Sequence, residues 1–333
     1  MLRMASSYVA VRLLLVLSFS TLFAACASSP DSTTTNPPTN SSAPSLDEPR
    51  SGHAAVADDE YIYVIGGLNK AGNLSSIEII NPKTKETMVL RDKITARRYL
   101  TAVWDGKESI YIFGGISQQD GVIWQEKTVE VFNTRTQEVT TTTPMRVPRR
   151  FNSAVLLNNK IYVLGGSIYY PEAVEKAYAL RATSLVTAFD INTKKWSRVA
   201  NLPAARNTRA FTFNDQVCAV GGYDGFHKWS VFDCYDKAAG KWQLMPDAPD
   251  SVSAHSVAVH NDKLYVFGDY DNLDQVLMYD FSDNTWSYVD APYRASRHNA
   301  AVVFGNEVFV IGGTTGGSGP FLDDIQVLSL PLQ

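Results

Sequence analysis

The chain has 333 residues, of which 45% are hydrophobic and 19% are charged, and its formal net charge is −4. A chain of this length and composition can bury a large core in one folded domain. The small acidic charge provides no basic excess for nucleic-acid phosphates, so nucleic acid is not an expected partner.

Residues 1–25 have the features of an export signal. Arg3 and Arg12 give a positive start, and residues 13–25 form an apolar stretch of 13 residues. Such a stretch is too short for a stable membrane span and is typical of a removable signal peptide. The sequence LFAAC, ending at Cys26, resembles a bacterial lipoprotein box, which implies that Cys26 is lipidated and becomes the new amino terminus. In the alternative, an ordinary signal peptidase cuts nearby and Cys26 is incidental.

Residues 26–43 are expected to form a disordered tether. This segment is rich in Ser, Thr, Pro and Asn and has almost no large apolar residue, so it cannot repay the entropy of ordering. A flexible coil of 17 residues would hold the following domain on the order of 20–25 Å from a membrane. Ala27, rather than Asp, after the cysteine favours the outer membrane where a cell has two. The lipid anchor would be the only membrane contact.

One sequence pattern then occurs six times. In each unit, a run of β-branched, aromatic or leucine residues ends in a glycine pair or in Gly-Asp, and the first glycines are 48, 51, 56, 47 and 44 residues apart. A period of this size in strand-forming sequence indicates the blades of a β-propeller. The first glycines are Gly66, Gly114, Gly165, Gly221, Gly268 and Gly312.

Each unit also carries turn and packing residues at constant offsets. In five units, an aromatic or aliphatic residue followed by Asn or Asp closes a later strand, and the Asn or Asp suits a tight turn. Six residues later, units three to five have Trp196, Trp242 and Trp286, which we expect to be mostly buried between sheets.

Together these features resemble the kelch repeat, in which a strand ending in Gly-Gly is followed by Tyr-Asp and then Trp. The resemblance covers about Arg50 to Leu330, with Asp269 in place of a second glycine and no Trp in units one and two. It implies an all-β fold, a six-bladed kelch-type β-propeller over residues 44–333, with four antiparallel strands in each blade. The chain stops before a fourth strand of unit six, so residues 43–48 are expected to supply that outer strand and close the ring.

Cys218 and Cys234 are expected on neighbouring strands of unit four. An exported compartment permits a disulfide between them. In the alternative, both serve as small apolar residues, as cysteines often do in kelch-like strands.

In such a propeller, the connections between blades and the loops between the second and third strands of each blade meet on one face, the mouth. Five of the six connections between blades carry arginine, which suits a carboxylate, a phosphate or an acidic peptide. In the alternative, each arginine fixes its own loop by bonding backbone carbonyls. The arginines are Arg50, Arg97, Arg98, Arg149, Arg150, Arg206, Arg209, Arg294 and Arg297, and unit five has His255 with Asp250, Ser251 and Ser253 instead.

The loops between second and third strands add aromatic residues, which are typical of sugar or peptide recognition, although each could equally pack within its own loop. From both sets of loops we select eight candidate ligand-binding residues. They are Arg50, Arg98, Arg149, Arg206, Arg297, His255, Tyr223 and Tyr270.

Unit three has an insertion at residues 171–182 whose pattern predicts a short helix over the mouth, either as a specificity element or as rim decoration. Two acidic residues there, Glu172 and Glu175, are the candidate catalytic residues. With Arg206 they could supply an acid–base group beside an anion clamp.

These observations favour a non-enzymatic, monomeric binding module, anchored in the cell envelope, for a protein or glycan partner with an anionic group. The alternative is an enzyme of the sialate mutarotase (N-acetylneuraminate epimerase) type, because those periplasmic proteins are also exported six-bladed kelch-like propellers that bind an anionic sugar. No cofactor or metal is expected. The five histidines have no ligand spacing, and the paired tyrosines and histidines of the similar galactose oxidase type copper enzymes cannot be placed.

Overall fold

The computed structural model describes residues 44–172 and 179–332. The predicted signal peptide, Cys26 and the tether therefore lie outside the described residues, as does Glu175. The chain divides into two units, Met1–Ser41 and Ser42–Gln333, and the fold below is that of the second. No helix in the described ranges is long and apolar enough to cross a membrane.

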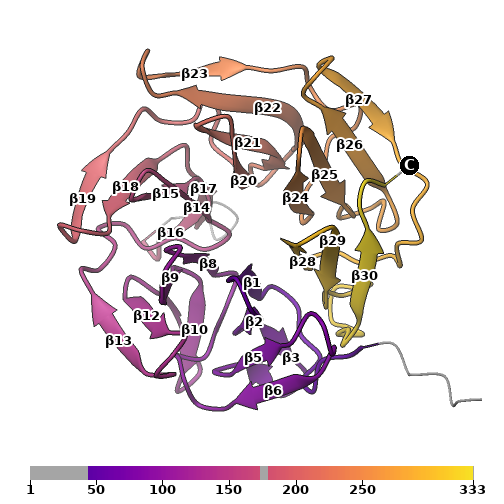
Figure 1. Ribbon diagram of the computed structural model, residues 1–333. Coiled ribbons are helices and arrows are strands. Elements are labelled where there is room, and N and C mark those ends of the chain that lie inside the picture. The colour runs from indigo at the N-terminus through magenta and orange to yellow at the C-terminus, as the bar shows by residue number, and fades with distance from the viewer. Residues whose placement is uncertain (1–43, 173–178, 333) are drawn as a thin grey trace, which may run out of the picture. The chain divides into compact units, whose positions relative to one another are not determined.

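Antiparallel sheets lie around a common centre (Figure 1). Apart from the short strands described below, the strands of each sheet follow one another across the sheet in the order of the sequence. Among the described residues, five of these sheets have four strands and one has three. They consist of β1 (Ala54–Ala57), β2 (Ile62–Ile65), β5 (Ile77–Ile80) and β6 (Thr87–Leu90); β8 (Thr101–Trp104), β9 (Ser109–Phe113), β12 (Val129–Asn133) and β13 (Val139–Thr142); β14 (Ser153–Leu157), β15 (Lys160–Leu164), β18 (Val186–Asp190) and β19 (Lys195–Arg198); β20 (Asn207–Phe213), β21 (Gln216–Tyr223), β22 (Lys228–Asp236) and β23 (Lys241–Leu244); β24 (Ser256–His260), β25 (Lys263–Phe267), β26 (Val276–Asp280) and β27 (Thr285–Tyr288); and β28 (Ala300–Phe304), β29 (Glu307–Ile311) and β30 (Ile325–Ser329).

These sheets confirm the predicted all-β, blade-like units. The first strand of each sheet lies nearest the centre, and each first strand contacts the first strand of the next sheet. β28 in turn contacts β1. Side chains of the second and third strands fill the space between neighbouring sheets, where most of them are fully buried.

Short strands form three further small sheets among the described residues. They are formed by β3 (Leu68–Asn69) with β4 (Gly72–Asn73), by β10 (Ile116–Gln119) with β11 (Val122–Gln125) and β7 (Arg97–Arg98), and by β16 (Ser167–Tyr169) with β17 (Leu180–Ala182). The last hairpin corrects part of the predicted helix, because residues 180–182 pair with β16 as a strand. The middle of that predicted helix, residues 173–178, lies outside the described residues.

The glycine pairs are needed because backbone carbonyl groups from another segment of the chain pass very close to them. Gly165 has φ +53°, and a Cβ there would lie 2.3 Å from the carbonyl oxygen of Arg206. At Gly222 a Cβ would lie 1.8 Å from the carbonyl oxygen of Asn207. A side chain at either position would force the backbone to move. Asp269 can replace a second glycine because its φ lies outside the left-handed region, unlike that of Gly268.

The predicted turns form as expected. Asn81 Oδ1 accepts hydrogen bonds from the backbone N–H groups of Lys83 and Thr84, and Asn133 and Asp190 make the same pair of bonds in their own turns. The three tryptophans are half-buried rather than mostly buried, because each lies on an outermost strand with one side toward solvent. Their indole N–H groups donate to the carbonyls of Thr143, Ala200 and Pro246 in the preceding connection.

Cys218 and Cys234 lie opposite each other on β21 and β22 and form a disulfide. Both side chains are buried beside Phe211 and Phe232 in the core between the fourth and fifth sheets. The sequence had left this bond and an apolar role as alternatives, and the structure has the bond.

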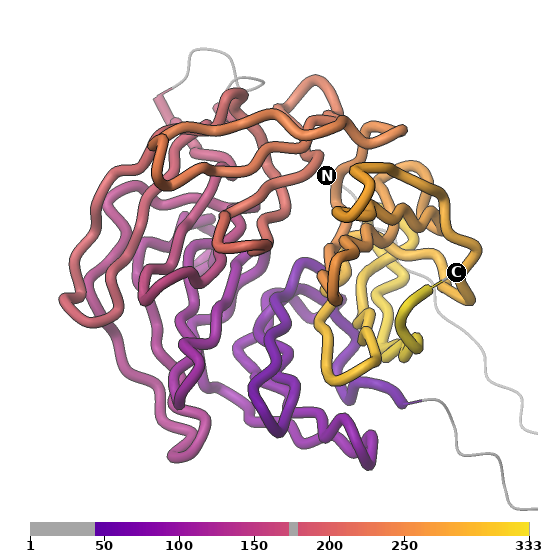
Figure 2. Tube along the Cα trace, turned by 45° about the horizontal axis from the view of Figure 1, so that its top comes forward, coloured from indigo at the N-terminus to yellow at the C-terminus, as the bar shows by residue number. Residues whose placement is uncertain are grey.

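The first described residues contact the last sheet. The N–H of Leu46 donates to the carbonyl of Asp323 over 2.7 Å, and the N–H of Ile325 donates to the carbonyl of Pro44 over 3.2 Å. Figure 2 shows this indigo segment beside the yellow chain that leads into β30. The contact is a single bridge, Ser45 to Asp324, rather than a full outer strand. Leu46 is buried against the core between the first and sixth sheets.

Candidate functional site

One arginine in each of the first four connections is buried and holds its own loop. Arg50, Arg97, Arg149 and Arg206 are at most 1% exposed. Each donates a hydrogen bond to the carbonyl of the first glycine of its unit, at 3.0–3.1 Å. These contacts match the alternative in which each arginine fixes its own loop by bonding backbone carbonyls. They correct the expectation that Arg50, Arg149 and Arg206 line the mouth, because their donors are directed to buried carbonyls.

Three of these arginines also pair with a carboxylate on the third strand of the same sheet. Arg50 Nη2 lies 3.1 Å from Glu78 Oε2, and Arg97 and Arg206 contact Glu130 and Asp233 in the same way. Burial raises the pKa of Glu78 and of Asp233, although the neighbouring arginine acts in the opposite direction. Arg206 cannot serve the proposed acid–base chemistry, because Asp233 already engages it inside the sheet.

A series of backbone hydrogen bonds joins the connections of neighbouring units at the mouth. Gly52, Tyr99, Phe151, Ala254 and His298 each adopt a left-handed conformation, with φ between +52° and +63°. The N–H of His298 donates to Ala254, that of Gly52 to His298, that of Tyr99 to Gly52, and that of Phe151 to Tyr99, over 2.7–3.0 Å. Five of the six connections are therefore joined by one backbone motif.

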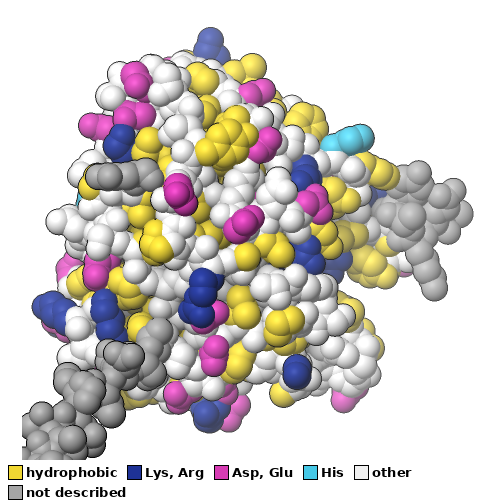
Figure 3. Space-filling view, turned by 90° about the vertical axis from the view of Figure 1, so that its right-hand side faces the viewer, with side chains coloured by type: hydrophobic (Ala, Val, Ile, Leu, Met, Phe, Trp, Pro, Cys, Tyr) yellow, Lys and Arg dark blue, Asp and Glu magenta, His cyan; other side chains and the backbone are white. Residues whose placement is uncertain are grey.

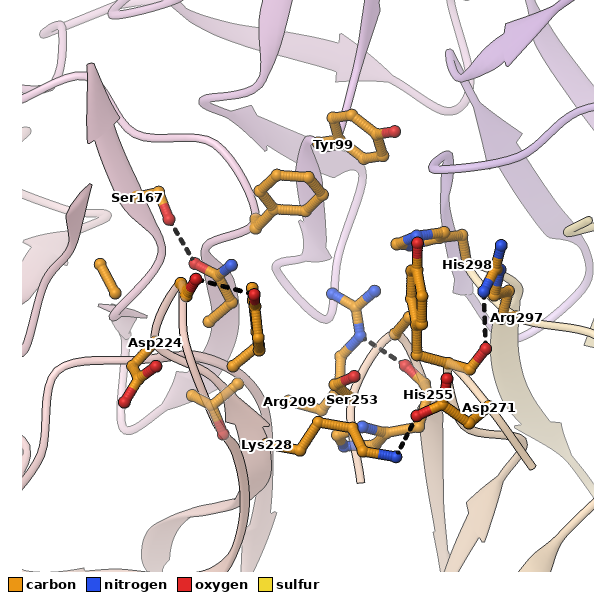
Figure 4. A pocket seen from close by; sticks show the side chains of 18 of the residues that line it. Tyr99, Ser167, Arg209, Asp224, Lys228, Ser253, His255, Asp271, Arg297 and His298 are labelled. Atoms are coloured by element: carbon orange, nitrogen blue, oxygen red, sulfur yellow. Dashed lines mark hydrogen bonds and ion pairs between the residues drawn. The ribbon is translucent and has the colours of Figure 1, made fainter. Parts of the chain in front are cut away.

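Unit four interrupts this series. It has no left-handed residue in its connection, and β20 begins directly at Asn207, with a register shift before Arg209. The side chain of Arg209 spans the gap, because its Nε donates to the carbonyl of His255 over 2.8 Å. Its Nη1 and Nη2 atoms have no hydrogen-bond partner among the described residues, and Figure 4 shows the guanidinium projecting into a cavity.

This cavity has a volume of about 920 Å³ and is lined by residues from all six connections. Four of the eight predicted ligand-binding residues line it, namely His255, Tyr223, Tyr270 and Arg297. The rings of Tyr99 and Phe151 form one wall with their centroids 4.0 Å apart, and His298 lies 5.6 Å from Tyr99. The mouth therefore combines aromatic faces with a cation that has free donors.

Two histidines of the mouth, His255 and His298, are neutral at physiological pH. Burial lowers the pKa of both His255 and His298 to about 3, and the positive charge of Arg209 adds to this effect. Burial also lowers the pKa of Arg209, to about 10, which leaves the guanidinium charged at neutral pH.

The other cations of the mouth already have partners. Lys228 Nζ lies 2.7 Å from both Asp269 Oδ2 and Asp271 Oδ2. Burial alone would lower the pKa of Lys228, but these two carboxylates raise it. Arg297 lies over the ring of Tyr270 and donates to its carbonyl over 2.6 Å. Among the described residues, Arg209 therefore keeps both of its terminal nitrogens free to bind a ligand, without a carboxylate or an aromatic ring against it.

The remaining predicted residues lie elsewhere. Arg98 donates to Asn73 Oδ1 over 2.6 Å and is not among the lining residues. Glu172 is exposed and does not line the cavity either. Within the described ranges, no group of three or more His, Cys, Asp or Glu residues could hold a metal ion.

The eight candidate ligand-binding residues chosen from the sequence did not include Arg209, Lys228, His298, Tyr99 or Phe151. One signal for Arg209 was present, because Arg206 precedes its first glycine by 15 residues, whereas the spacing is 16 in units one and three. The residue that unit four lacks is the one with the left-handed conformation in the other connections. Without it, the side chain of Arg209 lies at this point of the mouth.

Exposed aromatic side chains surround the mouth. The five side chains are between 38% and 67% exposed, and they lie at the end of the second strand or between the second and third strands of their units; they are Tyr169, Tyr170, Tyr223, Phe226 and Tyr270. By contrast, the side of the domain carrying β27 and β30 shows acidic and basic side chains interspersed, without a patch of one sign (Figure 3). Aromatic surface and free donors therefore coincide at the mouth.

Comparison with known proteins gives a consistent result. The KLHDC2/KLHL20/DRC7 Kelch-repeats domain matches residues 16–166 and 52–268, and the Kelch motif matches residues 251–290. Kelch-like protein 25 of Xenopus tropicalis is 28% identical over 217 residues, which cover 61% of this chain and 34% of that protein. Kelch-like protein 36 of Rattus norvegicus is 28% identical over 206 residues, covering 60% and 32%. The chain spans about a third of the length of these relatives.

Proposed function

Since the chain belongs to the kelch-repeat family, we propose that it is a six-bladed propeller that binds a protein or glycan partner through its mouth. A kelch module generally serves as a protein-binding scaffold. The observation that carries the proposal is the free guanidinium edge of Arg209 within an aromatic-walled cavity. A partner that presents a carboxylate beside an apolar group or a sugar ring fits this arrangement.

The six-bladed ring is supported by the contact between β28 and β1 and by the bridge from Ser45 to Asp324. In this proposal the amino-terminal segment takes the place of a fourth strand in the sixth sheet. The exposed edge of β30 is thereby partly covered.

The alternative of a mutarotase-type enzyme has less support. Its acid–base pair required Arg206 beside Glu172 or Glu175, but Arg206 is buried with Asp233. Two histidines that line the cavity, His255 and His298, have pKa values of about 3 and would be poor proton carriers near neutral pH.

Binding at the mouth can be tested with peptide and glycan arrays, followed by calorimetry of the hits on the full chain. We expect Arg209→Ala to weaken binding by about 1.5–3 kcal/mol, the value of a hydrogen bond to a charged group. Protonation of His255 and His298 should not change the affinity between pH 5 and pH 8, because burial lowers the pKa of both to about 3. Arg135→Ala, an exposed arginine that pairs with Glu108 away from the cavity, is the matched control.

Unfolding of both variants must be measured alongside, because Arg209 also bonds the carbonyl of His255. Arg209→Lys keeps the charge but loses the two-pronged donor, so its affinity should fall between those of the wild type and Arg209→Ala. Undiminished affinity in a folded Arg209→Ala variant would rule out the mouth as the binding site.

We further propose that the protein is exported and held in the cell envelope by a lipid on Cys26, which is its only contact with the membrane. The support is the sequence of residues 1–43 alone. We expect fatty-acid labelling of the wild type in a bacterial host and no labelling of Cys26→Ser. A labelled Cys26→Ser protein would exclude this residue as the lipid anchor.

A further inference from the structure

At one buried position, unit three departs from the three other units that have a buried arginine. The third strands of units one, two and four have Glu78, Glu130 and Asp233 opposite the buried arginine, whereas unit three has Thr187. Arg149 is 1% exposed and bonds the Thr187 hydroxyl and three backbone carbonyls. It therefore carries a buried positive charge without a carboxylate partner.

A second hydrogen bond is also absent from Arg149. In units one, two and four, the buried arginine donates to the carbonyl two residues before it, at 3.1–3.3 Å. Arg149 makes no such bond to Val147, and its Nε has no partner although it is buried. Burial lowers the pKa of Arg149 to about 10 with no acidic group acting in the opposite direction.

A small cavity of about 110 Å³ lies at this position. Arg149, Thr187 and Val147 line it, together with Trp196 and two further arginines, Arg146 and Arg198. Arg146 and Arg198 are exposed and form no ion pair with any described residue. No acidic residue lines the cavity, and it shares no lining residue with the mouth.

We propose that this cavity is a second binding site, separate from the mouth, that accepts one carboxylate group. The carboxylate takes the place that Glu78, Glu130 and Asp233 occupy in the sibling units. It accepts hydrogen bonds from Arg149 and is attracted by Arg146 and Arg198 at the entrance, while the Trp196 ring packs against its carbon atoms. The group belongs either to a small carboxylic acid or to an acidic side chain of a partner protein.

The first test uses acetate as the probe on the full chain, with chloride at equal ionic strength as the reference. Acetate should raise the melting temperature, because a ligand that binds only the folded state stabilises it. Arg146→Ala and Arg198→Ala should each weaken acetate binding by about tenfold while the protein stays folded, as for the loss of one charge-assisted contact. Arg135→Ala should bind acetate as the wild type does. Equal melting temperatures in acetate and chloride would overturn the proposal.

The second test supplies the carboxylate from the chain itself. Thr187→Glu should melt at a higher temperature than Thr187→Gln, which has the same shape without the charge, and neither should respond to acetate. A Thr187→Glu protein that melts at or below Thr187→Gln would contradict a carboxylate site. Binding of phosphate as tight as that of acetate would also contradict it.

Blocked tripeptides with a central Asp or Asn distinguish the two sources of the carboxylate. Tighter binding of the Asp peptide than of acetate, with loss on Arg198→Ala, would assign the site to an acidic side chain of a partner. Acetate binding with no response to the Asp peptide would assign it to a small acid. Neither result depends on the mouth, since Arg209→Ala should leave both affinities unchanged.

Discussion

Replacing Asp233 by Asn should lower the free energy of unfolding by about 3–5 kcal/mol, as for other buried ion pairs that lose one partner. Asp233 and Arg206 are both fully buried and paired, so the variant leaves the Arg206 guanidinium charged and without its carboxylate. Denaturant unfolding of the two proteins measures the difference.

An exposed ion pair provides the control for this experiment. Lys85 and Glu307 are 3.2 Å apart with partly exposed side chains, so Glu307→Gln should cost less than about 1 kcal/mol. The double variant Arg206→Met with Asp233→Leu should recover part of the loss, because the unpaired charge is gone. A loss below about 1 kcal/mol in Asp233→Asn would contradict the structural role assigned to the buried arginines.

Deletion of residues 43–49 should cost roughly 3–6 kcal/mol and lower the melting temperature. The segment buries Leu46, a contribution of about 1.5–3 kcal/mol, and makes hydrogen bonds with Asp323 and Ile325 that contribute about 0.5–1.5 kcal/mol each. It also contains Glu48, which pairs with Arg50. Thermal unfolding measures the effect, and deletion of residues 27–42 is the matched control.

Two outcomes are informative here. If deletion of residues 27–42 leaves the stability unchanged while deletion of residues 43–49 lowers it, the amino-terminal segment closes the sixth sheet. An unchanged melting curve for the 43–49 deletion would contradict that closure, and the sixth sheet would then be stable with three strands.

Local signals in the sequence predicted the sheets well. The apolar runs before the glycine pairs became second strands, and the Asn or Asp positions formed turns, because both depend on residues close in the chain. Two local predictions were inaccurate. Residues 180–182 are strand because they pair with β16, and the tryptophans are half-buried because their strands are outermost.

The site was harder to predict because it depends on burial and on pairing across sheets. The sequence showed an arginine in most connections but could not tell Arg206, which faces a carboxylate inside its sheet, from Arg209, which faces the cavity. The difference arises from a single missing residue before β20. Nothing in the sequence singled out Thr187, because only the structure places it opposite a buried arginine, Arg149.

Hydrogen–deuterium exchange on the full chain, with and without a bound peptide or glycan, tests the central claim most directly. The account predicts slower exchange in residues 223–228 and 270–272 and at Arg297 and His298, which lie together around the mouth. Exchange in the outer strands β6, β13 and β27 should not change. Protection confined to those outer strands, with none at the mouth, would contradict the proposed function.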